Sequence, residues 1–185
     1  MAWTIVAAML TQDAELPKAR EYVQKQLAGA IYAYAEPVRL EDPLIGRWLT
    51  GVALFETRGK LNREDPGRCP TAVLLIAVEV RTGRAFLVER VLALQDHLVK
   101  VAGEADARSA ALFAAKLFSC HASPCERAYG GFSPANFEAR ATPDGWAAGG
   151  NLRDVQGREF AFEATFGPDG LLKEYTHAYK PHRHK

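Results

Sequence analysis

The feature that most constrains the fold is an order of elements that occurs twice. Apolar side chains from Leu16 to Tyr34 recur at steps of three and four, which is typical of an amphipathic helix. Residues 104–118 predict a second helix, because acidic residues begin it and alanine and leucine fill it. Several strand-like runs follow each helix. The order predicts an α+β fold built from two units, each a helix followed by about four antiparallel strands.

The strands of the first half are rich in apolar residues. Residues 47–60 are expected to form one strand, and residues 71–80 and 85–94 form a hairpin around a short turn at Arg81–Arg84. Both faces of this hairpin are apolar, so we expect it to be central and covered. The polar, turn-rich residues 61–70 predict an exposed loop.

The strands of the second half alternate more clearly. "ANFEARAT", "WAAGGNLRD", "REFAFEATF" and "LLKEYTHAY" are separated by glycine-rich turns. In the third of these, every second residue is Phe or Ala up to Phe166, and Glu, Ala or Thr lie between them. A period of two indicates a half-buried antiparallel strand with one polar face.

Two domains are therefore expected, at residues 1–98 and 99–185, with one fused compact domain as the alternative. A helix laid across a four-stranded meander resembles the cystatin-like arrangement, here in duplicate. The protease-binding cystatins carry a Q-x-V-x-G hairpin, whereas the nearest stretch here, "KQLAG" at Lys25–Gly29, lies in the first helix. The resemblance is one of topology, and it transfers no functional residue.

Charge and apolar content narrow the range of partners. A net charge of +1 shows no basic excess of the kind that nucleic-acid binding requires, so no nucleic acid is expected. The apolar run Trp3–Leu10 is too short to cross a bilayer, which takes about 20 residues, so no membrane partner is expected either. We interpret it as a strand or a first helical turn, with an export signal as the alternative.

The stretch from Ser119 to Gly131 concentrates reactive side chains. We interpret Cys120, His121 and Cys125 as a helix end and its loop, because a zinc site would need a second ligand pair elsewhere. An odd number of cysteines favours a reducing, cytoplasmic location, in which Cys69 would be the most reactive thiol. Export is the alternative, and it would join Cys120 to Cys125 and leave Cys69 free.

The polar face of the second sheet offers the best candidate site. Glu159 and Glu163 lie about 13 Å apart along one strand, too far for the carboxylate pair of a glycosidase. With Glu138, Arg140, Arg153 and Lys173 they predict a solvated face with cross-strand ion pairs. We also place Tyr175 and His177 on this face, and the candidate ligand-binding residues are Glu163, Tyr175, His177 and Trp146.

The predicted function rests mainly on the motifs that the sequence lacks. The sequence contains no phosphate loop, dinucleotide fingerprint or catalytic motif, so no cofactor, metal or catalytic residue is expected. We expect a non-enzymatic binding protein of the inhibitor, immunity or adaptor type, which engages a protein partner through a sheet face or loops. The alternative is a cofactor-free enzyme or carrier for a small apolar molecule, held in a curved-sheet pocket.

Overall fold

The computed structural model describes residues 14–27, 29–63, 69–118, 130–131, 133–153 and 157–180. The apolar N-terminal run and almost all of the stretch from Ser119 to Gly131 lie outside them. The chain divides into two compact units. Among the described residues, the first unit contains those up to Glu41 and residues 51–89, and the second contains residues 42–50 and those from Arg90 onward.

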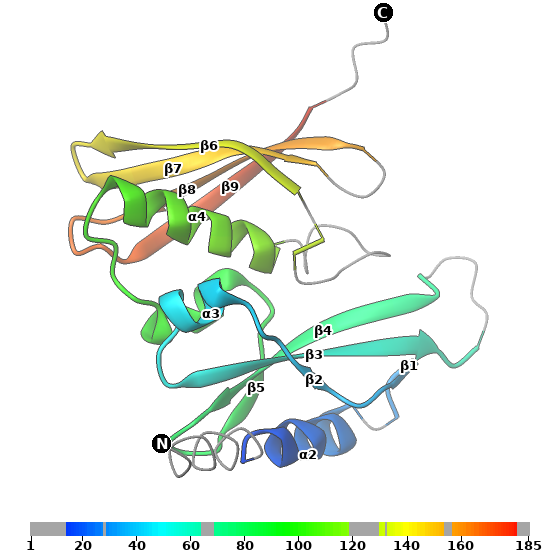
Figure 1. Cartoon of the computed structure of the whole chain (residues 1–185). Coiled ribbons are helices and arrows are strands. Elements are labelled where there is room, and N and C mark those ends of the chain that lie inside the picture. Colours follow the sequence, from blue (N-terminus) through cyan, green and yellow to red (C-terminus); the bar gives the residue numbers. More distant parts are fainter. Residues whose placement is uncertain are drawn as a thin grey trace, which may run out of the picture. The chain divides into compact units, whose positions relative to one another are not determined.

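The first unit combines one described helix with an antiparallel sheet. Figure 1 shows helix α2 beside this sheet, and α2 contacts β4 and β5. The strand order is β1-β3-β4-β5, and β2 also pairs with β3. The elements are α2 (Leu16–Gln26), β1 (Tyr32–Tyr34), β2 (Val38–Arg39), β3 (Val52–Leu61), β4 (Thr71–Glu79) and β5 (Ala85–Leu87).

Helix α2 is shorter than its apolar periodicity predicts. It carries a proline in its first turn, and it ends at Gln26 instead of continuing to Tyr34. Gly29 has φ +78°, a left-handed conformation that directs the chain out of the helix. Tyr32 and Tyr34 then pair with β3, because tyrosine packs well on a pleated surface and adjacent strand hydrogen bonds are available to it.

The hairpin around residues 81–84 is confirmed, with Ile76 opposite Leu87 and Val78 opposite Ala85. Its second strand ends at Leu87, however, and residues Val91–His97 form a 3-10 helix, η1. The expectation that the whole hairpin is central holds for β4, which lies between β3 and β5, but β5 is the edge strand and its residues are half-buried. Both faces of the β3–β4 pair are buried. Phe55, Ile76 and Val78 pack with Ala19 of α2 on one face, and Leu54 and Leu75 are buried on the other.

The start of the first predicted long strand is wrong. Residues Pro43–Trp48 form a short helix, α3, and β3 begins at Val52. The side chain of Asp42 accepts a hydrogen bond from the backbone N–H of Leu44 at 2.8 Å, and Pro43 occupies the first turn. An aspartate cap followed by proline is a start signal for a helix, which outweighs the strand propensity of Trp48.

The second unit follows the expected pattern closely. Helix α4 (Glu104–Phe118) has the predicted bounds, and the strands form an antiparallel meander in the order β6-β7-β8-β9. These strands are β6 (Ser133–Thr142), β7 (Gly145–Arg153), β8 (Glu159–Phe166) and β9 (Leu172–Lys180). A helix before a four-stranded meander is thus present, while a closer likeness to cystatins stays a prediction.

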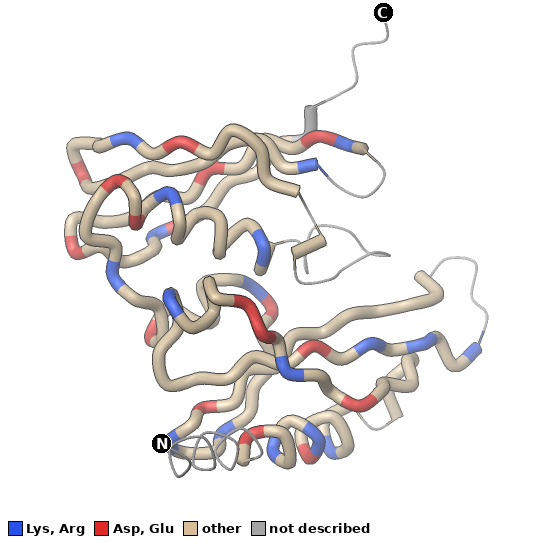
Figure 2. The backbone as a smooth tube through the Cα atoms, viewed as in Figure 1, with Lys and Arg blue, Asp and Glu red and all other residues tan. Residues whose placement is uncertain are grey.

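Helix α4 covers one face of the β6–β9 sheet, and Figure 1 shows it on that side only. It buries Phe113, Leu117 and Phe118 there. From the sheet, Ala148, Leu152, Phe162, Ala164 and Phe166 are buried. Acidic and basic residues are interspersed along these strands (Figure 2). The opposite side is called the open face. The described residues on it are Ser133, Ala135, Glu138, Arg140, Thr142, Gly145, Ala147, Gly149, Asn151, Arg153, Glu159, Ala161, Glu163, Thr165, Glu174, Thr176 and Ala178.

Candidate functional site

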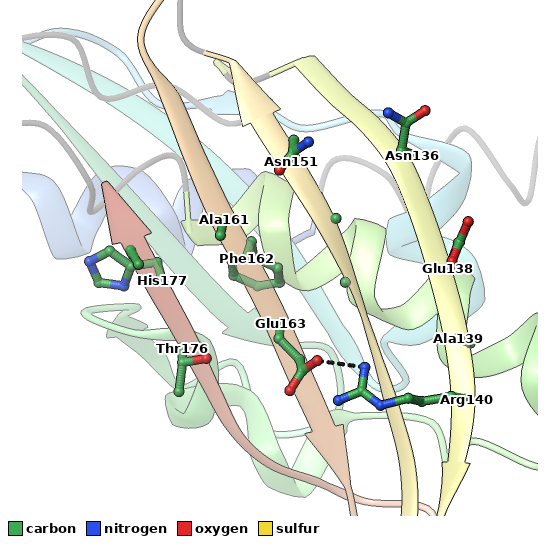
Figure 3. A pocket seen from close by; sticks show the side chains of 13 residues that line it. Asn136, Glu138, Ala139, Arg140, Asn151, Ala161, Phe162, Glu163, Thr176 and His177 are labelled. Carbon is green, nitrogen blue, oxygen red and sulfur yellow. Dashed lines mark ion pairs between the residues drawn. The ribbon is translucent and has the colours of Figure 1, made fainter. Parts of the chain in front are cut away.

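A depression of about 400 Å³ lies on the β6–β9 sheet, and Figure 3 views it from the open face. We call it the hollow. Side chains from all four strands surround it, so it does not depend on a loop. Its lining residues are Asn136, Glu138, Ala139, Arg140, Gly149, Gly150, Asn151, Ala161, Phe162, Glu163, Thr176, His177 and Ala178.

The hollow exists because small residues occupy the middle of the open face. Strand register places Glu138, Gly149, Glu163 and Thr176 in one cross-strand row. The next row contains Asn151, Ala161 and Ala178. Polar side chains therefore rise around a floor of glycine and alanine.

Two consecutive glycines in β7 are required by close backbone approach. A Cβ atom on Gly149 would lie 2.1 Å from the carbonyl oxygen of Phe162 on β8. A Cβ atom on Gly150 would lie 2.7 Å from the carbonyl oxygens of Ala135 and Asn136 on β6. The register of β6 shifts between Ala135 and Glu138, and Asn136 has φ 54°. At this bulge the β6 backbone lies against Gly150.

Ion pairs cross the open face, as predicted for a solvated sheet surface. Arg140 on β6 and Glu163 on β8 are 2.7 Å apart, and their pair spans β7 (Figure 3). Glu163 hydrogen-bonds to the Arg140 guanidinium and thereby raises its pKa above the ordinary arginine value. Arg153 and Glu159 form a second pair at 2.5 Å. These charges are compensated within the sheet.

Of the expected ligand-binding residues, Glu163 lies on the open face and lines the hollow. Our placement of Tyr175 and His177 on the same face is wrong. Glu163 pairs with Thr176, whereas His177 pairs with Phe162 and Tyr175 with Ala164, on the helix-facing side. The physical reason is a register shift between Thr165 and Phe166, which exchanges the faces of the later β9 residues.

Trp146 also departs from the expected site. It pairs with Phe166 at one end of β7 and shares the face of the buried Ala148. It is not among the residues that line the hollow. The structure thus brings Glu163 and His177 to the hollow, His177 from the other side of the sheet, and leaves Tyr175 and Trp146 away from it.

An aromatic cluster occupies the helix-facing side. The ring of Phe118 lies 5.6 Å from Phe162, 5.8 Å from Tyr175 and 4.5 Å from His177. Burial raises the pKa of Tyr175, and a backbone hydrogen bond from Val91 partly offsets this. Tyr175 is therefore a half-buried packing residue of the α4 side, whereas His177 contacts Phe118 there but is exposed and also lines the hollow.

The interior of this unit is well filled. A cavity of about 10 Å³ remains among Trp48, Val91, Phe113, Phe166 and Leu172 and their neighbours. One water molecule needs about that much space, and a small-molecule site typically needs several hundred Å³. This cavity is therefore too small to hold an apolar ligand.

The cysteines differ from the expectation. Cys69, which we expected to be a free thiol, is disulfide-bonded. The predicted Cys120–Cys125 disulfide lies outside the described residues. Among the described residues, no group of three His, Cys, Asp or Glu side chains is arranged to hold a metal ion.

Sequence reasoning missed Asn136, Gly149, Asn151 and Thr176 as lining residues. One signal was present, because consecutive glycines inside a strand often mark a bulge or a close backbone approach.

None of the helices in the described part of the chain is long and apolar enough to span a membrane. In comparisons with known proteins, no family model, curated protein or solved structure matches this chain.

Proposed function

We propose that this chain is a non-enzymatic binding protein that engages a protein partner through the open face of the β6–β9 sheet. The observation that carries the proposal is the hollow, which joins a volume of about 400 Å³ to exposed polar side chains such as Glu138 and Thr176. Concave polar surfaces on a rigid scaffold are suited to recognition. An inhibitor, immunity or adaptor role would use such a surface without chemistry.

The composition of the open face favours protein over other ligands. The described side chains that point out from this face include no aromatic ring, and the two aromatic residues that line the hollow, Phe162 and His177, belong to the helix-facing side. Nucleobases are usually bound by stacking on exposed rings. Its arginines, Arg140 and Arg153, are engaged by Glu163 and Glu159. A phosphate ligand would therefore have to break an existing ion pair. A protein partner that forms hydrogen bonds with the open face needs no ring to stack on and need not break an ion pair.

The alternative of an apolar-ligand carrier receives less support. Its ligand would have to lie between α4 and the sheet, where the residual cavity is about 10 Å³. Occupation by a small molecule would require the Phe118 and Phe162 side chains to move apart, against their packing. We therefore keep the open face as the proposed site.

A photocrosslinking amino acid at Ala161, in the floor of the hollow, tests the proposal. The matched control carries the same amino acid at Ala105, which is exposed on α4. Each protein is irradiated in a lysate of the source cells, and crosslinked products are identified by mass spectrometry. We expect one protein to be crosslinked from Ala161 and not from Ala105.

A blocking variant, Ala161→Trp, should abolish the same interaction because the indole fills the hollow. Ala105→Trp should retain it. A partner that crosslinks equally from both positions, or that binds Ala161→Trp as well as the wild type, would contradict the proposal. Circular dichroism and thermal melting show whether each variant is folded, so a folding failure is recognised.

We also infer that the protein works in an oxidising compartment, in place of the cytoplasm that the odd cysteine number favoured. The supporting observation is the disulfide at Cys69. Disulfides persist in exported proteins and are rare in the reducing cytosol. Fractionation of source cells tests this, and recovery of the protein solely from the cytosol would contradict it.

A further inference from the structure

We infer that the hollow takes a cationic side chain, lysine or arginine, of the protein partner, with Glu138 as its acceptor. This inference rests on the proposed function and names the chemistry of its site. It follows from which charged side chains line the hollow and from which of them form ion pairs with one another.

Glu138 is the carboxylate of the hollow that lacks a counter-ion. It is exposed, and no ion pair involves it among the residues that the structure describes. Glu163, the other carboxylate, is neutralised by Arg140 at 2.7 Å. The carboxylates and the guanidinium of the hollow therefore sum to one negative charge (two carboxylates, one guanidinium). The whole chain, in contrast, has a net charge of +1.

The shape of the hollow suits a long, thin side chain. Glu138 and Glu163 flank Gly149 in one cross-strand row, so their backbones are about 10 Å apart, two strand spacings. No side chain rises between them, because Gly149 has none. The methylene stem of a lysine or arginine can lie on Ala161 and Ala178 while its charged end reaches Glu138.

An anionic ligand would find the opposite conditions. Its charge would face the carboxylate of Glu138, and Arg140 is already held by Glu163. A neutral apolar group would cover Glu138 and Asn136 without replacing their hydrogen bonds to water, which is unfavourable. A cationic group, in contrast, is attracted by the negative charge of Glu138 and can donate hydrogen bonds to the oxygens of Glu138 and Asn136.

Titration with small probes tests the inference without the partner. Backbone amide chemical shifts of the full chain are recorded while methylguanidinium, methylammonium or acetate is added at constant ionic strength. We expect both cations to shift the amides of Gly149 and Asn151 saturably, and acetate to leave them unchanged. Glu138→Gln should weaken cation binding by about tenfold, the loss typical of one charge-assisted hydrogen bond.

The matched control is Glu174→Gln, an exposed carboxylate on the same face that does not line the hollow. It should bind the cations like the wild type. Equal binding by Glu138→Gln, saturable shifts with acetate, or no saturable cation shifts would overturn the inference.

This failure can be told apart from failure of the proposed function. If a partner crosslinks from Ala161 while the cations do not bind, the open face is the interface but its occupant is not cationic. If the cations bind and no partner crosslinks, the hollow has the inferred chemistry and the proposed function is wrong.

Discussion

Arg140 on β6 and Glu163 on β8 form an ion pair of 2.7 Å that spans the intervening strand β7. Ala147, the register partner of Arg140 on β7, is 1% exposed although it lies on the open face. The pair therefore closes one end of the hollow and leaves its glycine and alanine floor accessible. Because this pair neutralises Glu163, Glu138 is the carboxylate of the hollow that has no ion pair with any residue that the structure describes.

The Arg140–Glu163 pair should contribute little to stability, because both side chains are largely in water. We predict that Arg140→Ala, Glu163→Ala and the double variant unfold at nearly the same urea concentration as the wild type. Any coupling in this double-mutant cycle should disappear at about 1 M salt, where the screening length is about 3 Å. A coupling that persists in high salt would show that the pair is shielded from solvent.

Gly149→Ala should destabilise the protein strongly. The new methyl group would lie 2.1 Å from the carbonyl oxygen of Phe162, so the β7 and β8 backbones must separate. We expect the free energy of unfolding to fall by about 1–3 kcal/mol or more. The control is Gly46→Ala in α3, where no atom lies within 4 Å. It should raise stability by about 0.5–1 kcal/mol. Urea unfolding of both variants measures the difference, and equal stabilities would contradict the described register.

Alkaline pH should destabilise the fold through two tyrosines. Burial is the main cause that raises the pKa of Tyr34 and of Tyr175 above the ordinary tyrosine value of 10.0. Above that pH the unfolded chain loses these protons before the folded chain does, so stability falls as pH rises through this range. The double variant Tyr34→Phe/Tyr175→Phe should show a weaker decline in melting temperature between about pH 9 and pH 11. If the melting temperature of the double variant falls as steeply as that of the wild type, these two tyrosines are not the cause of the loss of stability.

The cysteine chemistry should be visible by intact mass. The chain has three cysteines, and a disulfide at Cys69 occupies two of them. The denatured, unreduced protein should therefore accept one alkyl group, and the reduced protein three. Cys69→Ser should accept two without reduction. Three alkyl groups on the unreduced wild type would contradict the disulfide.

The sequence predicts the second unit better than the first. Residues 104–118 have strong helix propensity, and the alternation up to Phe166 fixes which side of β8 is buried, so both match the structure. In the first unit, Tyr34 fits the helical period that begins at Leu16, yet it lies in strand β1. Tertiary pairing with β3 decides between helix and strand, and no local pattern records that pairing.

The candidate site shows the same limit. Its polar face was predictable from the alternation of Glu159, Ala161 and Glu163. The partners of Glu163 on β9 were not, because one extra residue beside Thr165 reverses which side chains share its face. The hollow itself depends on the β6 bulge at Asn136, which brings two backbones together at Gly150. Such a bulge arises from strand pairing and leaves little trace in the sequence.

The most direct test of the open-face account is a map of amide chemical shifts on adding the partner identified by crosslinking from Ala161. The account predicts that the largest changes fall on Glu138, Gly149, Asn151, Ala161 and Thr176, which line the hollow from all four strands. Amides of α4 such as Arg108 and Lys116 should change little. Largest changes on α4 or on the first unit, with the hollow unaffected, would contradict the account.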